Sequence, residues 1–134
     1  MDAGALDAWL ENYRHCYENG DADLLVTLFT EDATYQEHPF MELVHGRDFH
    51  HFWSDVVNGA LERHIHFRVF CVSETEALVN WLADAIQVKT GKHREGDGVF
   101  HLTFAPDGRC SRLREWQTWH IVGEPLTPGW PNKA

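Results

Sequence analysis

The spacing of apolar residues changes once along the chain, near residue 60, and this change limits the folds that the chain can adopt. Before it, apolar side chains recur at helical spacing. This predicts a helix over residues 5–18, a short one that begins after Asp21 and breaks at Thr30–Asp32, and one from Gly46 to Asn58. After it, four segments rich in β-branched and aromatic residues are separated by turn signals. These predicted strands are Arg63–Ser73, Glu76–Lys89, Gly98–Ala105 and Arg109–Ile121. Helices followed by long antiparallel strands predict an α+β fold.

The four predicted strands are longer than usual, and a sheet of such strands is expected to curve. Gly96 and Gly98 are candidate sites for the β-bulges that would bend it. A curved sheet closed by helices encloses a cavity, for which we expect a volume on the order of several hundred Å³. A shorter strand is expected at Ala33–Glu37, before a proline. The domain should cover residues 1–122, and the proline-rich tail 123–134 should lie along its surface.

Charge and cysteine content exclude several classes of function. Lys and Arg number 11 against 21 Asp and Glu, which gives a formal net charge of −10. A surface this acidic repels phosphate backbones and anionic lipids, so we expect neither nucleic-acid binding nor membrane binding. No apolar run reaches the roughly 18–20 residues of a membrane-spanning helix, and Met1–Gly4 does not begin a signal peptide. Three cysteines without a CxxC pair predict reduced thiols and a cytoplasmic location. They are Cys16, Cys71 and Cys110.

The chain resembles the SnoaL-like branch of the nuclear transport factor 2-like (NTF2-like) superfamily from about residue 5 to residue 120. The resemblance rests on GDADLLVTLFTEDATYQEHPF (Gly20–Phe40), the helix start Gly46-Arg47-Asp48, and GDGVFHLTFAPDGRCSRLREWQTW (Gly96–Trp119). It implies a cone of strongly curved, mostly antiparallel sheet closed by three N-terminal helices, with a small hydrophobic molecule inside. It also implies a homodimer that uses no metal or other cofactor. Members include ketosteroid isomerase, polyketide cyclases, limonene-epoxide hydrolase, scytalone dehydratase and binding modules, so the fold alone does not choose a reaction.

The resemblance to ketosteroid isomerase implies roles for residues near both ends of the segment Gly20–Phe40. Tyr13, seven residues before Gly20, matches a phenol that helps to hold an oxyanion; alternatively it is a core tyrosine bonded to a backbone group. His38 stands where the isomerase has its carboxylate base, and Glu37 precedes it. Strand alternation lets one of these two face the cavity. Phe100 replaces the isomerase's protonated aspartic acid, which argues against steroid isomerisation.

Two carboxylates lie within otherwise apolar strand sequence. Glu115 shares a strand face with Leu113, Gln117 and Trp119, so its pKa should rise toward the range useful for proton transfer. The resemblance to limonene-epoxide hydrolase and SnoaL-type cyclases also implies an acid–base carboxylate here. The alternative is an ion pair with an arginine on a solvated face. Asp84 interrupts an apolar strand and is a second candidate, on the face opposite Trp81; the alternative is an edge carboxylate paired to a base.

Histidines raise the question of a metal. His64 and His66 share a strand face and His101 could join them, but no motif with metal-ligand spacing is present, so we expect no metal site. His66 followed by an aromatic resembles the pocket histidine of scytalone-dehydratase-like members. It is therefore a candidate acid or base, although scattered histidines are more often surface residues.

The sequence thus predicts two alternative functions. The first is a cofactor-independent isomerase, cyclase, dehydratase or hydratase type of enzyme; the second is a non-catalytic module that binds a ligand or a protein. In either case the expected lining is Trp9, Tyr17, Trp53, Trp81, Phe100, Gln117 and Trp119. An apolar outer face is expected to support a homodimer through Leu78, Leu82, Ile86 and Val88.

Overall fold

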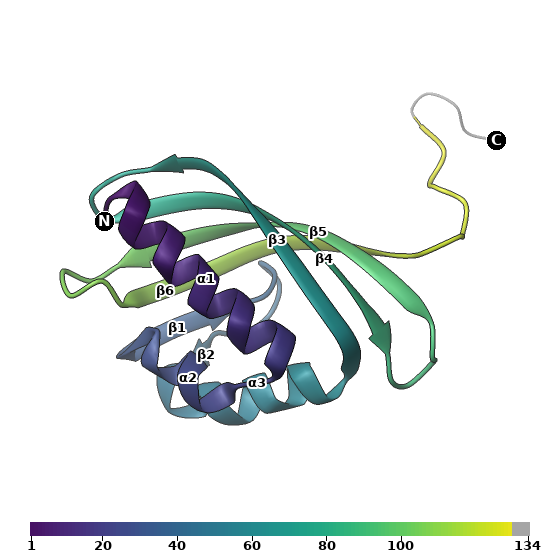
Figure 1. The fold of residues 1–134 in the computed structure, drawn as a ribbon, viewed down its shortest axis with the longest axis horizontal. Coiled ribbons are helices and arrows are strands. Elements are labelled where there is room, and N and C mark those ends of the chain that lie inside the picture. The colour runs from purple at the N-terminus through teal and green to yellow at the C-terminus, as the bar shows by residue number, and fades with distance from the viewer. Residues whose placement is uncertain (130–134) are drawn as a thin grey trace.

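Three helices pack on the concave side of a curved, six-stranded mixed sheet (Figure 1). The computed structural model describes residues 1–129. The helices are α1 (Ala3–Asn19), α2 (Ala22–Thr27) and α3 (Phe49–Asn58), with a 3-10 turn η1 (Gly46–Asp48) before the last. The strands are β1 (Phe29–Gln36), β2 (Val44–His45), β3 (Ala60–Val72), β4 (Glu76–Gln87), β5 (His93–Phe104) and β6 (Cys110–Ile121). This is the NTF2-like cone, and the α+β prediction is confirmed.

The strand order is β2-β1-β6-β5-β4-β3, and every pair is antiparallel except the parallel pair β1–β6. In Figure 1, α1 crosses the sheet diagonally, while α2 and α3 cover one end. Along β4 the burial alternates through Trp81, Ala83 and Ala85, which face the helices. The core is therefore a single layer between the three helices and the concave sheet face.

Local sequence explains where the first two helices begin and end. The Asp2 carboxylate caps α1 by accepting a hydrogen bond from the Ala5 N–H at 2.8 Å. Gly20 ends α1 in the left-handed conformation (φ 69°) that glycine adopts without strain. The Asp21 side chain accepts from the Leu24 N–H at 3.0 Å, which confirms it as the cap of the second helix.

Two boundaries differ most from the sequence prediction. Residues 30–32 were expected to be a break, but they lie inside β1, where the register against β6 shifts between Phe29 and Thr34. Strand β5 begins at His93, five residues before the predicted start at Gly98. The sequence did not predict this first part of β5, because its residues are polar and those on the outer face are exposed to solvent.

The bulge prediction for Gly96 and Gly98 is wrong. Both glycines pair in unbroken register, with Ala83 and Trp81 of β4 respectively. A Cβ atom at Gly98 would lie 2.4 Å from the Trp81 ring, and one at Gly96 would lie 2.8 Å from the Trp119 ring. Each glycine therefore leaves space for an indole that lies flat against the strand.

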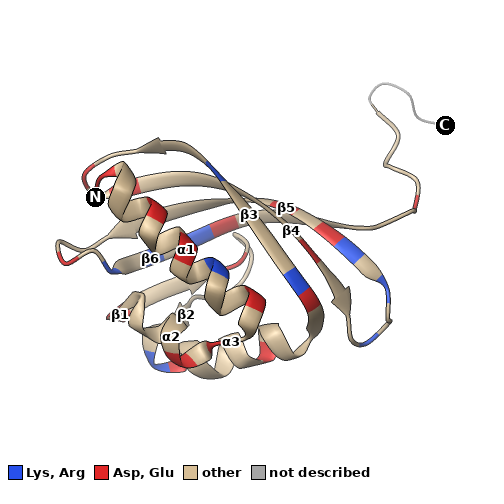
Figure 2. Ribbon diagram, viewed as in Figure 1, with Lys and Arg blue, Asp and Glu red and all other residues tan. Residues whose placement is uncertain are grey.

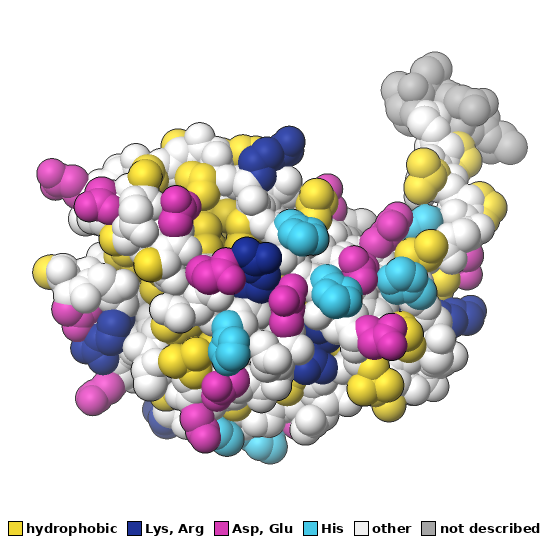
Figure 3. Space-filling model, viewed as in Figure 1, with side chains coloured by type: hydrophobic (Ala, Val, Ile, Leu, Met, Phe, Trp, Pro, Cys, Tyr) yellow, Lys and Arg dark blue, Asp and Glu magenta, His cyan; other side chains and the backbone are white. Residues whose placement is uncertain are grey.

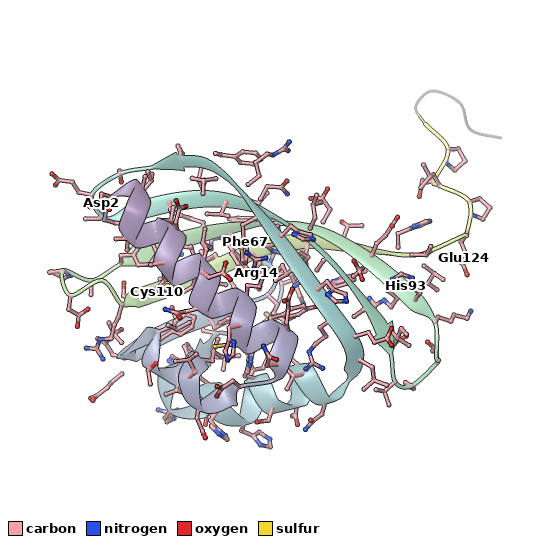
Figure 4. The ribbon with its side chains drawn as sticks, in the orientation of Figure 1. Asp2, Arg14, Phe67, His93, Cys110 and Glu124 are labelled. Atoms are coloured by element: carbon pink, nitrogen blue, oxygen red, sulfur yellow. The ribbon has the colours of Figure 1, made fainter. Side chains whose placement is uncertain are left out.

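The tail also differs from expectation in its described part. Residues 123–129 are exposed and run away from the domain (Figure 1), so this part of the segment does not lie along the surface. Its first residues stay near β5: the Val122 N–H donates to the His93 carbonyl at 2.9 Å, and Lys92 Nζ lies 4.0 Å from Glu124 Oε1. Figure 4 shows His93 beside the point where the tail leaves the sheet. The rest of the predicted tail, 130–134, is outside the described residues.

None of the described helices is long and apolar enough to cross a membrane.

Candidate functional site

A cavity lies between the helices and the concave face of the sheet. Its inner part has a volume of about 60 Å³. The residues that line it include Tyr13, Tyr35, Trp81, Phe100 and Glu115. A larger outer space of about 660 Å³ shares Tyr17, Glu37, Val56, Gln117 and Trp119 with it, so we describe the outer space as the cavity mouth. The volume near Glu115 is thus smaller than expected, because aromatic rings fill the interior, and most of the space lies at the mouth.

Glu115 is at the centre of a buried hydrogen-bond network. The Tyr35 hydroxyl donates to Glu115 Oε1 at 2.9 Å, and the Trp81 Nε1–H donates to Oε2 at 3.1 Å. The Tyr13 hydroxyl lies 2.9 Å from the Tyr35 hydroxyl, so a chain of three polar groups links α1 to β6. Glu115 is 5% exposed, and no cation forms an ion pair with it in residues 1–129. The arginine pairing considered as an alternative is therefore absent.

Burial changes the acidity of these groups. Desolvation raises the pKa of Glu115 well above its ordinary value, and the negative charge of Glu37 raises it further. The hydrogen bonds from Tyr35 and Trp81 act in the opposite direction because they stabilise the carboxylate. Burial, with Glu115 nearby, also raises the pKa of Tyr13 and Tyr35, so both phenols keep their protons as donors.

Glu37 forms a second polar chain at the cavity mouth. The Gln117 side-chain amide donates to the Glu37 carbonyl at 3.0 Å and to its carboxylate at 3.3 Å. The Trp119 Nε1–H donates in turn to Gln117 Oε1 at 2.6 Å. Desolvation raises the pKa of Glu37, although the Gln117 hydrogen bond and the nearby His38 lower it. Of the two candidates, Glu37 lines the inner cavity, whereas His38 is exposed and lines only the mouth.

Three other candidates lie away from the inner cavity. His66 is exposed on the outer face of β3, and Asp84 lies on the outer face of β4, with Oδ1 3.4 Å from His93 Nε2. Trp9 belongs to the core: its Nε1–H donates to the Leu28 carbonyl at 3.0 Å, and its ring stacks on Tyr13 at 5.6 Å between ring centroids. Neither His66 nor Asp84 can reach Glu115 through the sheet. Figure 3 shows histidine and acidic side chains interspersed on the face in view.

The remaining expected residues do line the inner cavity, together with four that the sequence interpretation missed. The expected ones are Tyr13, Tyr17, Glu37, Trp53, Trp81, Phe100, Glu115, Gln117 and Trp119. The missed ones are Tyr35, which joins Tyr13 to Glu115, and the apolar Val56, Ile65 and Ala83. Alternation along the predicted strand Ala33–Glu37 could have found Tyr35, because it shares a face with Ala33 and Glu37.

Replacing Tyr35 by phenylalanine is expected to lower the free energy of unfolding by about 1–3 kcal/mol. The change leaves both the Tyr13 hydroxyl and Glu115 Oε1 without their present partner. Tyr13→Phe removes one hydrogen bond instead of two, so its cost should be smaller. Urea unfolding of the two variants checks this order, and an equal or reversed order would contradict the network.

No group of three or more His, Cys, Asp or Glu side chains within residues 1–129 is arranged to hold a metal ion. His64 and His66, the pair that raised the metal question, are both exposed on β3.

Comparison with known proteins agrees with the fold. The sequence model of the SnoaL-like domain matches residues 10–113, so the chain belongs to the SnoaL-like domain family. Among curated proteins, no sequence matches significantly.

Solved structures extend the likeness to nearly the whole chain. One is the epoxide hydrolase/cyclase-like enzyme SalBIII, which has a role in pyran ring formation in the polyether salinomycin. It is 17% identical to this chain, with a TM-score of 0.78 over 90% of this chain and 98% of that one. The Δ5-3-ketosteroid isomerase from Mycobacterium sp. is 18% identical with a TM-score of 0.69 over 87% and 98%. A hexachlorocyclohexane dehydrochlorinase, LinA type 2, is 14% identical with a TM-score of 0.73 over 95% and 93%. At these identities the likeness shows the fold alone.

Proposed function

We propose that the chain is a cofactor-independent acid–base enzyme that binds a small, mostly apolar molecule with its reacting end at Glu115. One observation supports this most strongly: Glu115 is only 5% exposed, lines the cavity and accepts a hydrogen bond on each carboxyl oxygen. A buried carboxyl without a cation is costly to maintain, and such groups are concentrated at catalytic sites. The similar structures include an isomerase, a cyclase-like enzyme and a dehydrochlorinase, which fit this class of chemistry.

In the proposed mechanism, ionised Glu115 removes a proton from a carbon next to a carbonyl group of the substrate. The Tyr35 hydroxyl and the Trp81 N–H stabilise the carboxylate and orient it, and the aromatic walls exclude water. Protonated Glu115 then returns the proton to another carbon in an isomerisation, or to a departing hydroxyl in a dehydration. Tyr13 is a positioning residue, since its hydroxyl acts through Tyr35. Glu37 can serve as a second acid or base at the mouth side.

A panel of carbonyl-bearing polycycles, lactones and epoxides, tested on the wild type and on Glu115→Gln, distinguishes catalysis from binding. If the proposal is right, the variant binds the active compound but no longer converts it. The same turnover by both proteins would remove Glu115 from the mechanism.

The alternative proposal is a binding module, which the small inner volume of about 60 Å³ favours because it admits only a few non-hydrogen atoms. In that case some compounds of the panel bind and none is converted. Cys16, Cys71 and Cys110 are all free thiols, which fits the cytoplasmic location that we propose for either function.

We also propose that two copies associate through the outer face of β4. Leu78 and Leu82 of β4 are 38% and 50% exposed, Val88 just after the strand is 53% exposed, and Trp116 on the outer face of β6 is 42% exposed. Covering such a patch is favourable because it removes apolar surface from water. Sedimentation should therefore give the mass of a dimer, and Leu82→Asp should shift it toward the monomer. A monomeric wild type at high concentration would contradict this proposal.

A further inference from the structure

The cavity mouth carries two arginines, in a chain whose formal net charge is −10. Arg63 of β3 and Arg94 of β5 both line the outer space, and Glu37 is its one acidic lining residue in the described part of the chain. Figure 2 shows acidic residues spread over the fold and basic residues at fewer positions, among them β3 and β5. The mouth is thus a local exception to the acidic surface.

The two arginines differ in how they are held. The Arg63 guanidinium donates to the Tyr17 carbonyl at 2.6 Å and to the Val57 carbonyl at 2.7 Å, at the C-terminal ends of α1 and α3, and also to the carbonyl of Ala60. The carbonyls at a helix C-terminus favour a nearby positive charge. Arg63 is therefore a fixed charge whose donors are largely used by the protein itself.

Arg94, in contrast, has its donors free. Its guanidinium carbon lies 4.9 Å from the Trp119 ring centroid, and within residues 1–129 its side chain forms no hydrogen bond or ion pair. The stacking fixes the plane of the guanidinium without using its N–H groups. A planar guanidinium with unused N–H groups is the geometry that binds a carboxylate or phosphate through two parallel hydrogen bonds.

The distance from this guanidinium to Glu115 sets the length of a molecule that could reach both. Trp119 and Glu115 share the inner face of β6 and are four residues apart, about 13 Å along an extended strand. The wall between them combines apolar and polar groups: Trp81 packs against Trp119 at 5.7 Å between ring centroids, and Gln117, which lies between Glu115 and Trp119 on the same face, bonds to Glu37. The anion-binding group and the buried carboxyl thus lie at opposite ends of the cavity, whose walls are mainly aromatic rings with Glu37 and Gln117 among them.

We infer that the molecule taken up by the cavity is elongated and apolar, with one anionic group, a carboxylate or a phosphate, that Arg94 binds at the mouth. This inference rests on the proposed function, because it assumes that the cavity binds a ligand whose far end lies at Glu115. Arg63 contributes positive potential beside the anion but few free donors.

Three ten-carbon probes test the inference: decanoate, decyl phosphate and the uncharged 1-decanol, each titrated calorimetrically. At least one of the two anions should bind the wild type about tenfold or more tightly than 1-decanol, the effect of a single charge-assisted hydrogen bond. Arg94→Gln should remove this preference and leave 1-decanol binding unchanged. Comparing decanoate with decyl phosphate distinguishes the carboxylate from the phosphate.

Arg114→Gln is the matched control. Arg114 also stacks on a tryptophan, Trp116, at 4.9 Å, but on the outer face of the sheet, and its replacement changes the net charge equally. Equal binding of all three probes, or the same loss of anion preference in both variants, would overturn the inference. The proposed function would still stand, because binding of 1-decanol would show that the cavity takes up a ligand. Failure of 1-decanol and both anions to bind would contradict the ligand cavity itself. The midpoint temperature of thermal unfolding should be the same for Arg94→Gln as for the wild type, which checks that the variant is folded.

Discussion

Replacing Glu115 by glutamine should slow the removal of a proton from carbon by about 10²–10⁴-fold, the usual contribution of a positioned base. Glutamine has nearly the same shape, and its carbonyl can accept from Trp81 while its amide donates to the Tyr35 oxygen, so the network persists. A suitable reporter is 5-nitrobenzisoxazole, a small, mostly apolar molecule that needs no cofactor. A base removes its C3 proton, the electrons form a nitrile, and the N–O bond breaks to give a coloured phenolate.

The control for this experiment is Glu95→Gln. Glu95 is exposed on β5 and bonded to His120 at 3.1 Å, so its replacement removes a carboxylate without touching the cavity. The wild-type rate should persist in this variant. A Glu115→Gln protein as fast as the wild type would show that proton removal occurs elsewhere.

The pH dependence of the same reaction follows from the raised pKa of Glu115. The base form accumulates only as the pH rises through that raised pKa, so kcat/KM should rise with pH at values above the ordinary glutamate range and then level off. Stability should change in the opposite direction. The folded state holds the proton on Glu115 more tightly than the unfolded state does. The resulting stabilisation of the fold is therefore complete at pH values below the ordinary glutamate pKa, and it is lost as the pH rises through the raised pKa of the folded state. Urea unfolding across this range should show a weaker decline for Glu115→Gln, with the remainder due to Glu37, whose pKa is also raised.

Gly98→Ala should lower the free energy of unfolding by about 3 kcal/mol, the combined effect of overpacking and a strained buried hydrogen bond. The added Cβ would lie 2.4 Å from the ring of Trp81, which is 3% exposed and has no room to turn away. A displaced ring would also withdraw its N–H from Glu115. Chemical denaturation measures the loss, and Gly4→Ala is the control, because the nearest atom to its added Cβ is 3.5 Å away.

A second substitution shows whether the collision with Trp81 is the cause. Phenylalanine at position 81 lacks the ring atoms that lie closest to the added Cβ, so Gly98→Ala combined with Trp81→Phe should cost less than the two changes summed. If the losses in the free energy of unfolding were strictly additive, the effect of Gly98→Ala would not come from its contact with Trp81.

The parts of the fold and site that the sequence predicted are those encoded by short-range periodicity. Alternation placed Glu115, Gln117 and Trp119 on one face and Asp84 opposite Trp81, and both placements are confirmed. The link from Tyr35 to Glu115 joins residues 80 positions apart across the parallel pair β1–β6. Such a link depends on strand order and register, which periodicity does not encode.

The same limit explains the two incorrect predictions about glycine and cavity size. A glycine in a strand has several explanations, and the sequence does not show that an indole on a neighbouring strand occupies the space beside it. Ring packing also decides the interior volume: Tyr13 lies within 5.2 Å of Phe100 and 5.4 Å of Trp53 between ring centroids. These contacts leave little empty space around Glu115.

The two indoles that lie against glycines also constrain how this protein can diversify. A bulkier residue at position 98 becomes tolerable only once the tryptophan at 81 has been replaced by something smaller, and the same order holds for 96 and 119. Relatives with altered ligand preference should therefore have passed through the aromatic change first. Each glycine–tryptophan pair would then be inherited as a unit, and because the rings of Trp81 and Trp119 pack at 5.7 Å between centroids, a change in one pair should affect the other.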